Sequence, residues 1–193
     1  MLAALALAGS GVLPASTLSF SGNFTHDDDV VLIPFSISGS TLVTIQTTSF
    51  ADGSTGFEPV LTLFDGLGTF MFQDAGGNAP LDCGARLIDP ASGFCLDAYI
   101  QQTLGPGSYT LALSEAPNAP GGDLADGFPQ AGMGDFTGLP FGKTGPFYLF
   151  EGSQRTSAWA LQIDGAAVPE PGTMGLLGSC LLGTALLGLR LRR

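Results

Sequence analysis

The chain has 193 residues, enough for one domain of ordinary size with flanking segments, and its content of 45% hydrophobic and 12% charged residues excludes a disordered chain despite 29 glycines and 13 prolines. It carries 17 Asp and Glu against 6 Lys and Arg, and a single histidine. This balance excludes a nucleic-acid partner, which needs clustered basic side chains, and it excludes catalysis built on several histidines.

The first segment, residues 1–16, is an uncharged apolar run. Its length and its small residues are typical of the apolar core of a secretory signal peptide, with cleavage near Ala15. A short buried helix is the alternative, but Gly9, Gly11 and Pro14 would cut it to about two turns. No basic residue precedes the run, so either the natural start lies upstream or the signal is weak. We expect the chain to be exported.

Residues 17–167 predict an exported all-β domain, because apolar and polar residues alternate in short runs and no helical period is sustained. Pro34 restricts its strand to a sheet edge or a bulge. About seven or eight such strands favour an antiparallel β-sandwich or jelly roll. The apolar positions that define the strands are Leu18 and Phe20; Val31, Ile33, Phe35 and Ile37; Val43 and Ile45; residues 60–64; residues 70–72; Tyr109, Leu111 and Leu113; and Trp159, Leu161 and Ile163.

Three stretches of this domain have a resemblance to a known family. Residues 57–65, 97–100 and 104–111 resemble, in order, strands of bacterial pre-peptidase carboxy-terminal domains and of exported proteins related to them. The resemblance implies a small β-sandwich accessory module without catalytic residues. Residues 116–156 depart from the family pattern as a glycine-rich insertion, and a loop of that length is either functional or mobile.

The cysteines fall into two environments. Cys83 and Cys95 lie 12 positions apart in the part of the chain predicted to leave the cytoplasm, where a disulfide persists. Closing a loop of that size stabilises the fold by about 3 kcal/mol in the chain-entropy model. We therefore favour a disulfide over two free thiols. Cys180 falls in the carboxy-terminal apolar run and is most simply a small membrane residue, with acylation as the alternative.

The acidic side chains raise the question of a calcium site. Asp74, Asn78 and Asp82 lie in a glycine-containing stretch where several oxygens are able to converge on a hard cation. In the alternative, these residues cap turns, as do the aspartates at 27–29, because Asp and Asn side chains bind backbone NH groups. The EF-hand pattern is absent. We keep calcium as a hypothesis, expect no other cofactor, and expect His26 to be a surface residue rather than a metal ligand.

Hydrolytic chemistry has weak support in the residue pattern. A Ser-His-Asp triad would require the only histidine, and no Gly-x-Ser-x-Gly sequence occurs. A glycosidase pair of carboxylates is defined in space, so spacing leaves it open. Trp159 with Tyr99, Tyr109 and Tyr148 would be platforms for sugar rings, but a lone tryptophan at core spacing is more often buried. We therefore expect no catalytic residues and a protein that is not an enzyme.

The carboxy-terminal segment combines a Pro-Glu-Pro motif, an apolar run and a cluster of arginines. No charged side chain occurs in the 19 residues from 171 to 189; as a helix they span about 28 Å, enough to cross a thin bilayer. The terminal arginines should stay in the cytoplasm and place the β domain outside. The three parts are Val168, Pro169, Glu170 and Pro171; a transmembrane helix predicted at 174–189; and Arg190, Arg192 and Arg193.

This three-part tail, residues 168–193, resembles the PEP-CTERM sorting signal of Gram-negative bacteria. The resemblance implies recognition by an exosortase, a membrane transpeptidase that cuts near the motif and releases or transfers the protein toward the cell surface, often in bacteria that make exopolysaccharide. Two prolines hold the backbone extended, so that a protease is able to read the motif as a strand. An ordinary tail anchor after a proline-rich linker is the alternative.

Together these features predict an exported structural or interaction protein of the cell envelope or extracellular matrix, which passes through the inner membrane of a Gram-negative bacterium. Its expected partners are an exosortase, the membrane before processing, and exopolysaccharide. A carbohydrate-binding surface module, with or without calcium, is the first alternative, and a glycoside hydrolase is the second.

Overall fold

The computed structural model of the chain describes residues 16–51, 56–76, 83–84, 86–90 and 93–166. Across these ranges the regular structure is all-β, as predicted, with two short 3-10 helices and no α-helix. The elements are β1 (Ser16–Asn23), β2 (Val31–Ile37), β3 (Thr41–Thr47), β4 (Pro59–Asp65), β5 (Phe70–Asp74), β6 (Tyr99–Leu104), β7 (Gly107–Glu115), η1 (Leu124–Asp126), η2 (Leu139–Phe141) and β8 (Ala158–Ala166).

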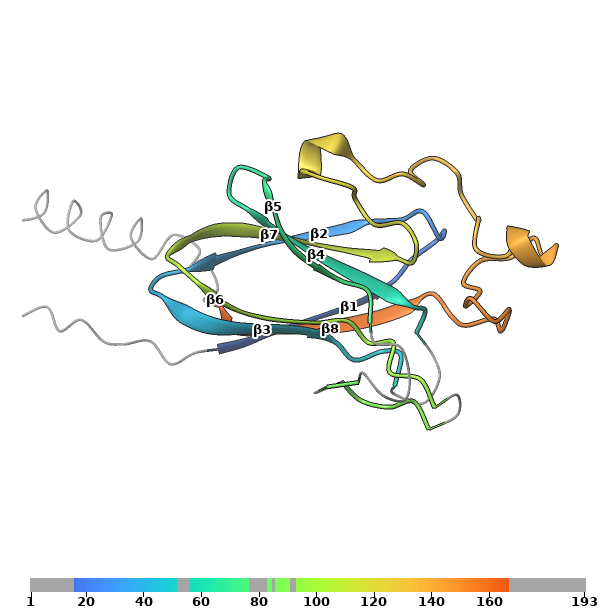
Figure 1. Cartoon of the computed structure of the whole chain (residues 1–193), viewed down its shortest axis with the longest axis horizontal. Coiled ribbons are helices and arrows are strands. Elements are labelled where there is room, and N and C mark those ends of the chain that lie inside the picture. The colour runs from blue at the N-terminus through green and yellow to red at the C-terminus, as the bar shows by residue number, and fades with distance from the viewer. Residues whose placement is uncertain (1–15, 52–55, 77–82, 85, 91–92, 167–193) are drawn as a thin grey trace, which may run out of the picture.

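The strands form two antiparallel four-stranded sheets, in the orders β1-β8-β3-β6 and β2-β7-β4-β5. Figure 1 shows them as two layers that face each other. Each strand of the first half of the chain pairs with its counterpart counted from the other end: β1 with β8, β2 with β7, β3 with β6, and β4 with β5. The chain is therefore one long hairpin wrapped across two sheets, which is the strand order of a jelly roll.

The predicted alternation directs one face of each strand into a shared core. In β2, Ile33, Phe35 and Ile37 are buried, while the side chains between them are exposed or half-buried. Pro34 lies in the same strand, which is at the edge of its sheet as expected. Trp159 of β8 is 9% exposed and packs in the core. It is therefore a core residue rather than a platform for a sugar ring.

The strand register gives the sandwich two unlike ends. At one end Ser16 pairs with Ala166, the last described residue, and at the other Asn23 pairs with Ala158. Glu115, after which the 116–156 insertion begins, also lies at that second end, opposite Pro59. We call the end with Ser16 and Ala166 the proximal end and the end with the insertion the distal end (Figure 1).

Several predicted features lie outside the described residues. They are the signal peptide at 1–16, except for Ser16, the sorting segment with its helix at 174–189, and the residues Asn78 and Asp82. In the described part of the chain, no helix has the length and hydropathy needed to span a bilayer. The resemblance to pre-peptidase carboxy-terminal domains stays a prediction.

Candidate functional site

The 116–156 insertion lies over the distal end of the sandwich, and one buried carboxylate makes four of the hydrogen bonds that fix it there. Asp27, in the connection between β1 and β2, is fully buried. Its Oδ2 accepts hydrogen bonds from the backbone NH of Phe136 (3.0 Å), the backbone NH of Thr137 (2.7 Å) and the Thr137 hydroxyl (2.6 Å). Its Oδ1 accepts a hydrogen bond from the NH of Phe147 (2.7 Å). Asp27 thus joins two separate turns of the insertion.

Phe147 has a backbone φ of 63°, in the left-handed region that a bulky aromatic residue rarely adopts. Its side chain is buried, and its ring stacks on Phe57 with centroids 5.5 Å apart. Its carbonyl accepts a hydrogen bond from the NH of Arg155 at 2.7 Å. The surrounding contacts therefore hold a strained residue in place, and such residues cluster at ligand-binding and catalytic sites.

The two aspartates that follow in the chain cap turns. The Asp28 carboxylate accepts a hydrogen bond from the NH of Gly132 at 2.8 Å, and that of Asp29 accepts one from the NH of His26 at 3.0 Å. The imidazole of His26 is about half exposed, and its Nδ1 lies 3.0 Å from Oδ1 of Asp135. This ion pair raises the pKa of His26, which lies on the surface as expected.

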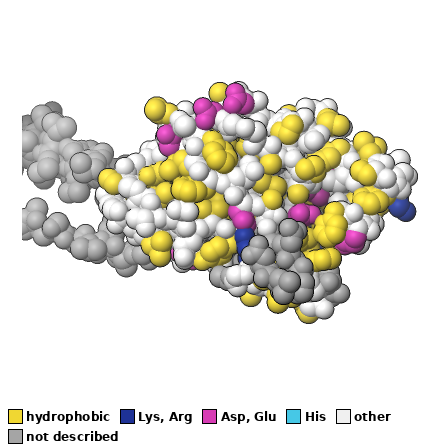
Figure 2. All heavy atoms as spheres, in the orientation of Figure 1, with side chains coloured by type: hydrophobic (Ala, Val, Ile, Leu, Met, Phe, Trp, Pro, Cys, Tyr) yellow, Lys and Arg dark blue, Asp and Glu magenta, His cyan; other side chains and the backbone are white. Residues whose placement is uncertain are grey.

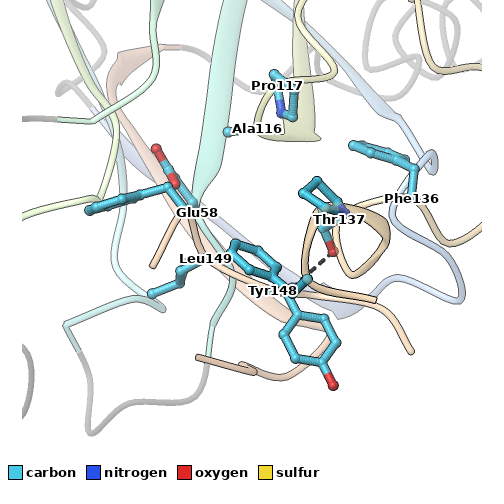
Figure 3. A pocket seen from close by; sticks show the side chains of 10 residues that line it. Glu58, Ala116, Pro117, Phe136, Thr137, Tyr148 and Leu149 are labelled. Carbon is cyan, nitrogen blue, oxygen red and sulfur yellow. Dashed lines mark hydrogen bonds between the residues drawn. The ribbon is translucent and has the colours of Figure 1, made fainter. Parts of the chain in front are cut away.

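Where β4 begins and β7 ends, the insertion forms part of the wall of an open pocket of about 410 Å³, a size usual for small-molecule sites. Its wall is mainly apolar and aromatic, and Glu58 is the one carboxyl group among the described residues that form it (Figure 3). Such a wall suits a ligand with an apolar face and one polar group. The lining residues are Glu58, Ala116, Pro117, Phe136, Thr137, Pro140, Phe141, Tyr148, Leu149 and Phe150.

Glu58 stands directly before β4, and its backbone carbonyl accepts a hydrogen bond from the NH of Ala116 at 2.9 Å. Burial, and after it the negative charge of Glu151, raise the pKa of the Glu58 carboxyl to about 7. No hydrogen bond from the described residues offsets this rise. The pocket therefore holds a partly desolvated carboxyl group whose hydrogen-bonding capacity is open to a ligand.

Glu115, the last residue of β7, is 1% exposed. Burial raises its pKa to about 10, with further contributions from the charge of Asp27 and a hydrogen bond with it. Glu115 therefore keeps its proton at neutral pH. Among the described residues its Oε2 has no hydrogen-bond partner, so the hydrogen bond with Asp27 belongs to its other carboxyl oxygen.

Asp74, the one residue of the calcium hypothesis that the structure describes, does not line the pocket. Asp74, at the end of β5, forms an ion pair with Arg86 (Nη2 to Oδ1, 2.6 Å) and accepts a hydrogen bond from the NH of Tyr99 at 2.8 Å. Within the described ranges, no group of three or more His, Cys, Asp and Glu side chains is placed to hold a metal ion. With Asn78 and Asp82 outside these ranges, the calcium hypothesis stays a prediction.

Two further links hold the loops. A disulfide joins Cys83 and Cys95. The guanidinium of Arg155 lies over the ring of Phe50, 4.1 Å from its centroid, and donates a hydrogen bond to the Phe50 carbonyl at 2.8 Å. It also pairs with the fully buried Asp89 at 3.3 Å. Arg155 thus ties the end of the insertion to two earlier loops.

The pocket contains few of the residues that the sequence singles out. Of the predicted sugar platforms, Tyr148 lines the pocket, whereas Tyr109 and Trp159 lie in the core. The residues around Glu58 in the sequence do not mark it as a site residue, because it reaches the insertion only through the pairing of β4 with β7. One signal was available, since the glycine-rich insertion contains five phenylalanines, and three of them, at 136, 141 and 150, line the pocket.

Comparison with known proteins bears on the tail. Residues 167–193 match the family model of the PEP-CTERM protein-sorting motif. The match confirms the predicted resemblance of this segment and indicates an exported protein that an exosortase targets and that is transiently anchored in the membrane of a Gram-negative bacterium. A search of curated proteins found no match to the chain.

Proposed function

We propose that the chain is an exported structural or interaction protein of the cell envelope or extracellular matrix, which an exosortase processes through its tail. The observation that carries this proposal is the match of residues 167–193 to the PEP-CTERM motif. The matched segment begins directly after β8, which ends at Ala166. Cleavage near the Pro-Glu-Pro motif would therefore release the whole sandwich.

The described domain has properties that suit a protein located outside the cytoplasm. The disulfide between Cys83 and Cys95 is typical of proteins in an oxidising compartment. The chain has a formal net charge of −11, which favours solubility and repels anionic surfaces.

The proposal is tested by the mass and location of the full chain in a Gram-negative host that expresses an exosortase. We expect the wild-type chain to lose its tail and to leave the membrane fraction. The variant with Pro169, Glu170 and Pro171 all changed to alanine should stay in the membrane with its tail attached, because the extended backbone is no longer fixed. Intact-mass spectrometry of each fraction reports the cleavage.

Two controls make the result specific. Pro129→Ala changes an exposed proline of the insertion and should be processed like the wild type. The wild-type chain in a host without exosortase should keep its tail. A wild-type chain that keeps its full mass in the host with the enzyme would contradict the proposal.

Carbohydrate binding is a second function, which the aromatic pocket beside Glu58 favours. Retention of the full chain on immobilised polysaccharides, with calcium and then with a chelator, tests both the binding and its dependence on calcium. The third prediction, a glycoside hydrolase, requires two carboxyl groups that flank the scissile bond, and the described lining of the pocket supplies one. Turnover of a glycan panel tests that prediction separately.

A further inference from the structure

The distal pocket is a feature that sorting does not use. The proximal end carries Ala166, after which the sorting segment follows, whereas the pocket lies at the opposite end of the strands. This cavity of about 410 Å³ with an aromatic wall therefore lies away from the segment that is cleaved. Its chemistry therefore indicates what the exported domain binds.

The wall of the pocket exposes aromatic surface to solvent. Phe150 is 61% exposed and Phe141 is 37% exposed, and Phe141 lies 6.4 Å from Tyr148 between ring centroids. Met133 and Leu139 of the insertion are also exposed. Figure 2 shows hydrophobic side chains over much of this face of the molecule, including the end that carries the insertion. Exposed apolar area of this kind marks a binding surface, and flat aromatic rings match the C–H face of a pyranose ring.

The charge around the pocket selects among sugars. Glu58 lies in the wall and the negative charge of Glu151 acts on it, whereas the buried Glu115 keeps its proton and adds no charge. None of the described lining residues is basic. An acidic sugar would therefore be repelled, and a neutral sugar would leave the desolvated Glu58 without a counter-charge. An ammonium group would neutralise it.

We propose that the distal pocket binds an amino sugar with a free amine, whose ring packs on Phe141, Tyr148 and Phe150 and whose ammonium group pairs with Glu58. This proposal rests on carbohydrate binding, the second function proposed above. The amine and the apolar ring face are both required, because the pocket offers one carboxyl group and an aromatic wall.

Isothermal titration of the full chain in detergent micelles at pH 7 tests the proposal with three ligands. A β-1,4-linked glucosamine trisaccharide carries ring and charge, its N-acetylated counterpart carries the ring without the charge, and choline carries the charge without the ring. We expect the free amine to bind about tenfold or more tightly than the N-acetylated trisaccharide, the usual strength of a charge-assisted contact. Choline should bind more weakly than the free amine.

Variants then assign the effect to residues. Glu58→Gln keeps the shape of the side chain and should remove the preference for the free amine, so that both trisaccharides bind alike. Phe150→Ala should weaken both trisaccharides. Phe70→Ala, which changes an exposed phenylalanine of β5 outside the pocket, should change neither affinity. Circular dichroism and the thermal transition of each variant show whether it is folded.

The outcomes separate this proposal from those it rests on. Equal affinity of wild-type protein for both trisaccharides overturns the amino-sugar assignment and leaves carbohydrate binding intact. Binding of the free amine that Glu58→Gln does not weaken also overturns it. If neither trisaccharide binds, carbohydrate binding at this pocket fails as well. The proposal that the tail is a sorting signal is tested independently, by the intact mass of the chain.

Discussion

Among the individual side chains, Glu115 links protonation to the stability of the distal end. Its pKa is about 10 in the folded protein against 4.5 as the ordinary value, because burial disfavours the charged form. Between these two pH values the folded state binds more protons at this site than the unfolded state does. The free energy of unfolding must therefore decrease as the pH rises through this window.

Replacing Glu115 by glutamine removes this proton equilibrium while keeping a hydrogen-bond donor beside Asp27. The stability of the wild type should fall relative to that of Glu115→Gln by up to about 1.4 kcal/mol per pH unit within the window. The variant should therefore gain most at alkaline pH. Urea denaturation at several pH values from 5 to 9 measures the difference.

Asp126→Asn is the matched control, because it removes an exposed carboxyl group of the same insertion. Its stability should follow the pH dependence of the wild type closely. Parallel curves for the wild type and Glu115→Gln would show that Glu115 does not hold a proton in the folded protein.

The insertion is the element whose order depends most on a distant residue. Asp27 accepts four hydrogen bonds from it, and an asparagine there would turn an NH₂ group toward backbone donors. We expect Asp27→Asn to lose about 3 kcal/mol of local stability, which corresponds to amide exchange faster by about 100-fold in residues 132–150. Hydrogen exchange read by mass spectrometry measures this change.

Core amides of β4 and β7 should keep their protection in the same variant, because local opening leaves the sandwich folded. Asp28→Asn provides the comparison, since the Asp28 side chain accepts one hydrogen bond, from Gly132, and should have a smaller effect. Unchanged exchange in the insertion of Asp27→Asn would mean that packing, rather than Asp27, holds this element.

The strands and the insertion differ in how far the sequence predicts them. The alternation of apolar and polar residues correctly predicts Ile33 and Phe35 as buried, because successive side chains of a strand point to opposite faces of the sheet. The pairing of strands is not local, since Ser16 pairs with Ala166. The folding of the insertion depends likewise on contacts such as Asp27 to Thr137, 110 positions apart. The pocket arises from these contacts, so residue patterns indicated its aromatic content and not its position.

At the scale of the whole molecule, we expect the proximal and distal ends of the sandwich to have different roles. The longest strands have nine residues and at about 3.3 Å per residue give a sandwich about 30 Å long. Residues 167–173 separate Ala166 from the predicted membrane helix at 174–189, and such a segment spans at most about 25 Å when extended. Before cleavage the proximal end is therefore expected to lie near the bilayer, with the pocket facing away from it.

Labelling of single introduced cysteines tests this orientation on spheroplasts, from which the outer membrane has been removed so that the reagent reaches the domain. Met133→Cys lies on the exposed surface of the insertion, and Ser40→Cys lies in the exposed proximal turn between β2 and β3. In a host without exosortase, a bulky polymer maleimide should label Met133→Cys several-fold faster, because the bilayer shields the proximal turn. Once an exosortase has released the domain, both cysteines should react at similar rates. Equal rates before cleavage would show that the tail does not hold the proximal end at the membrane, and the pocket would then have no fixed direction relative to the cell.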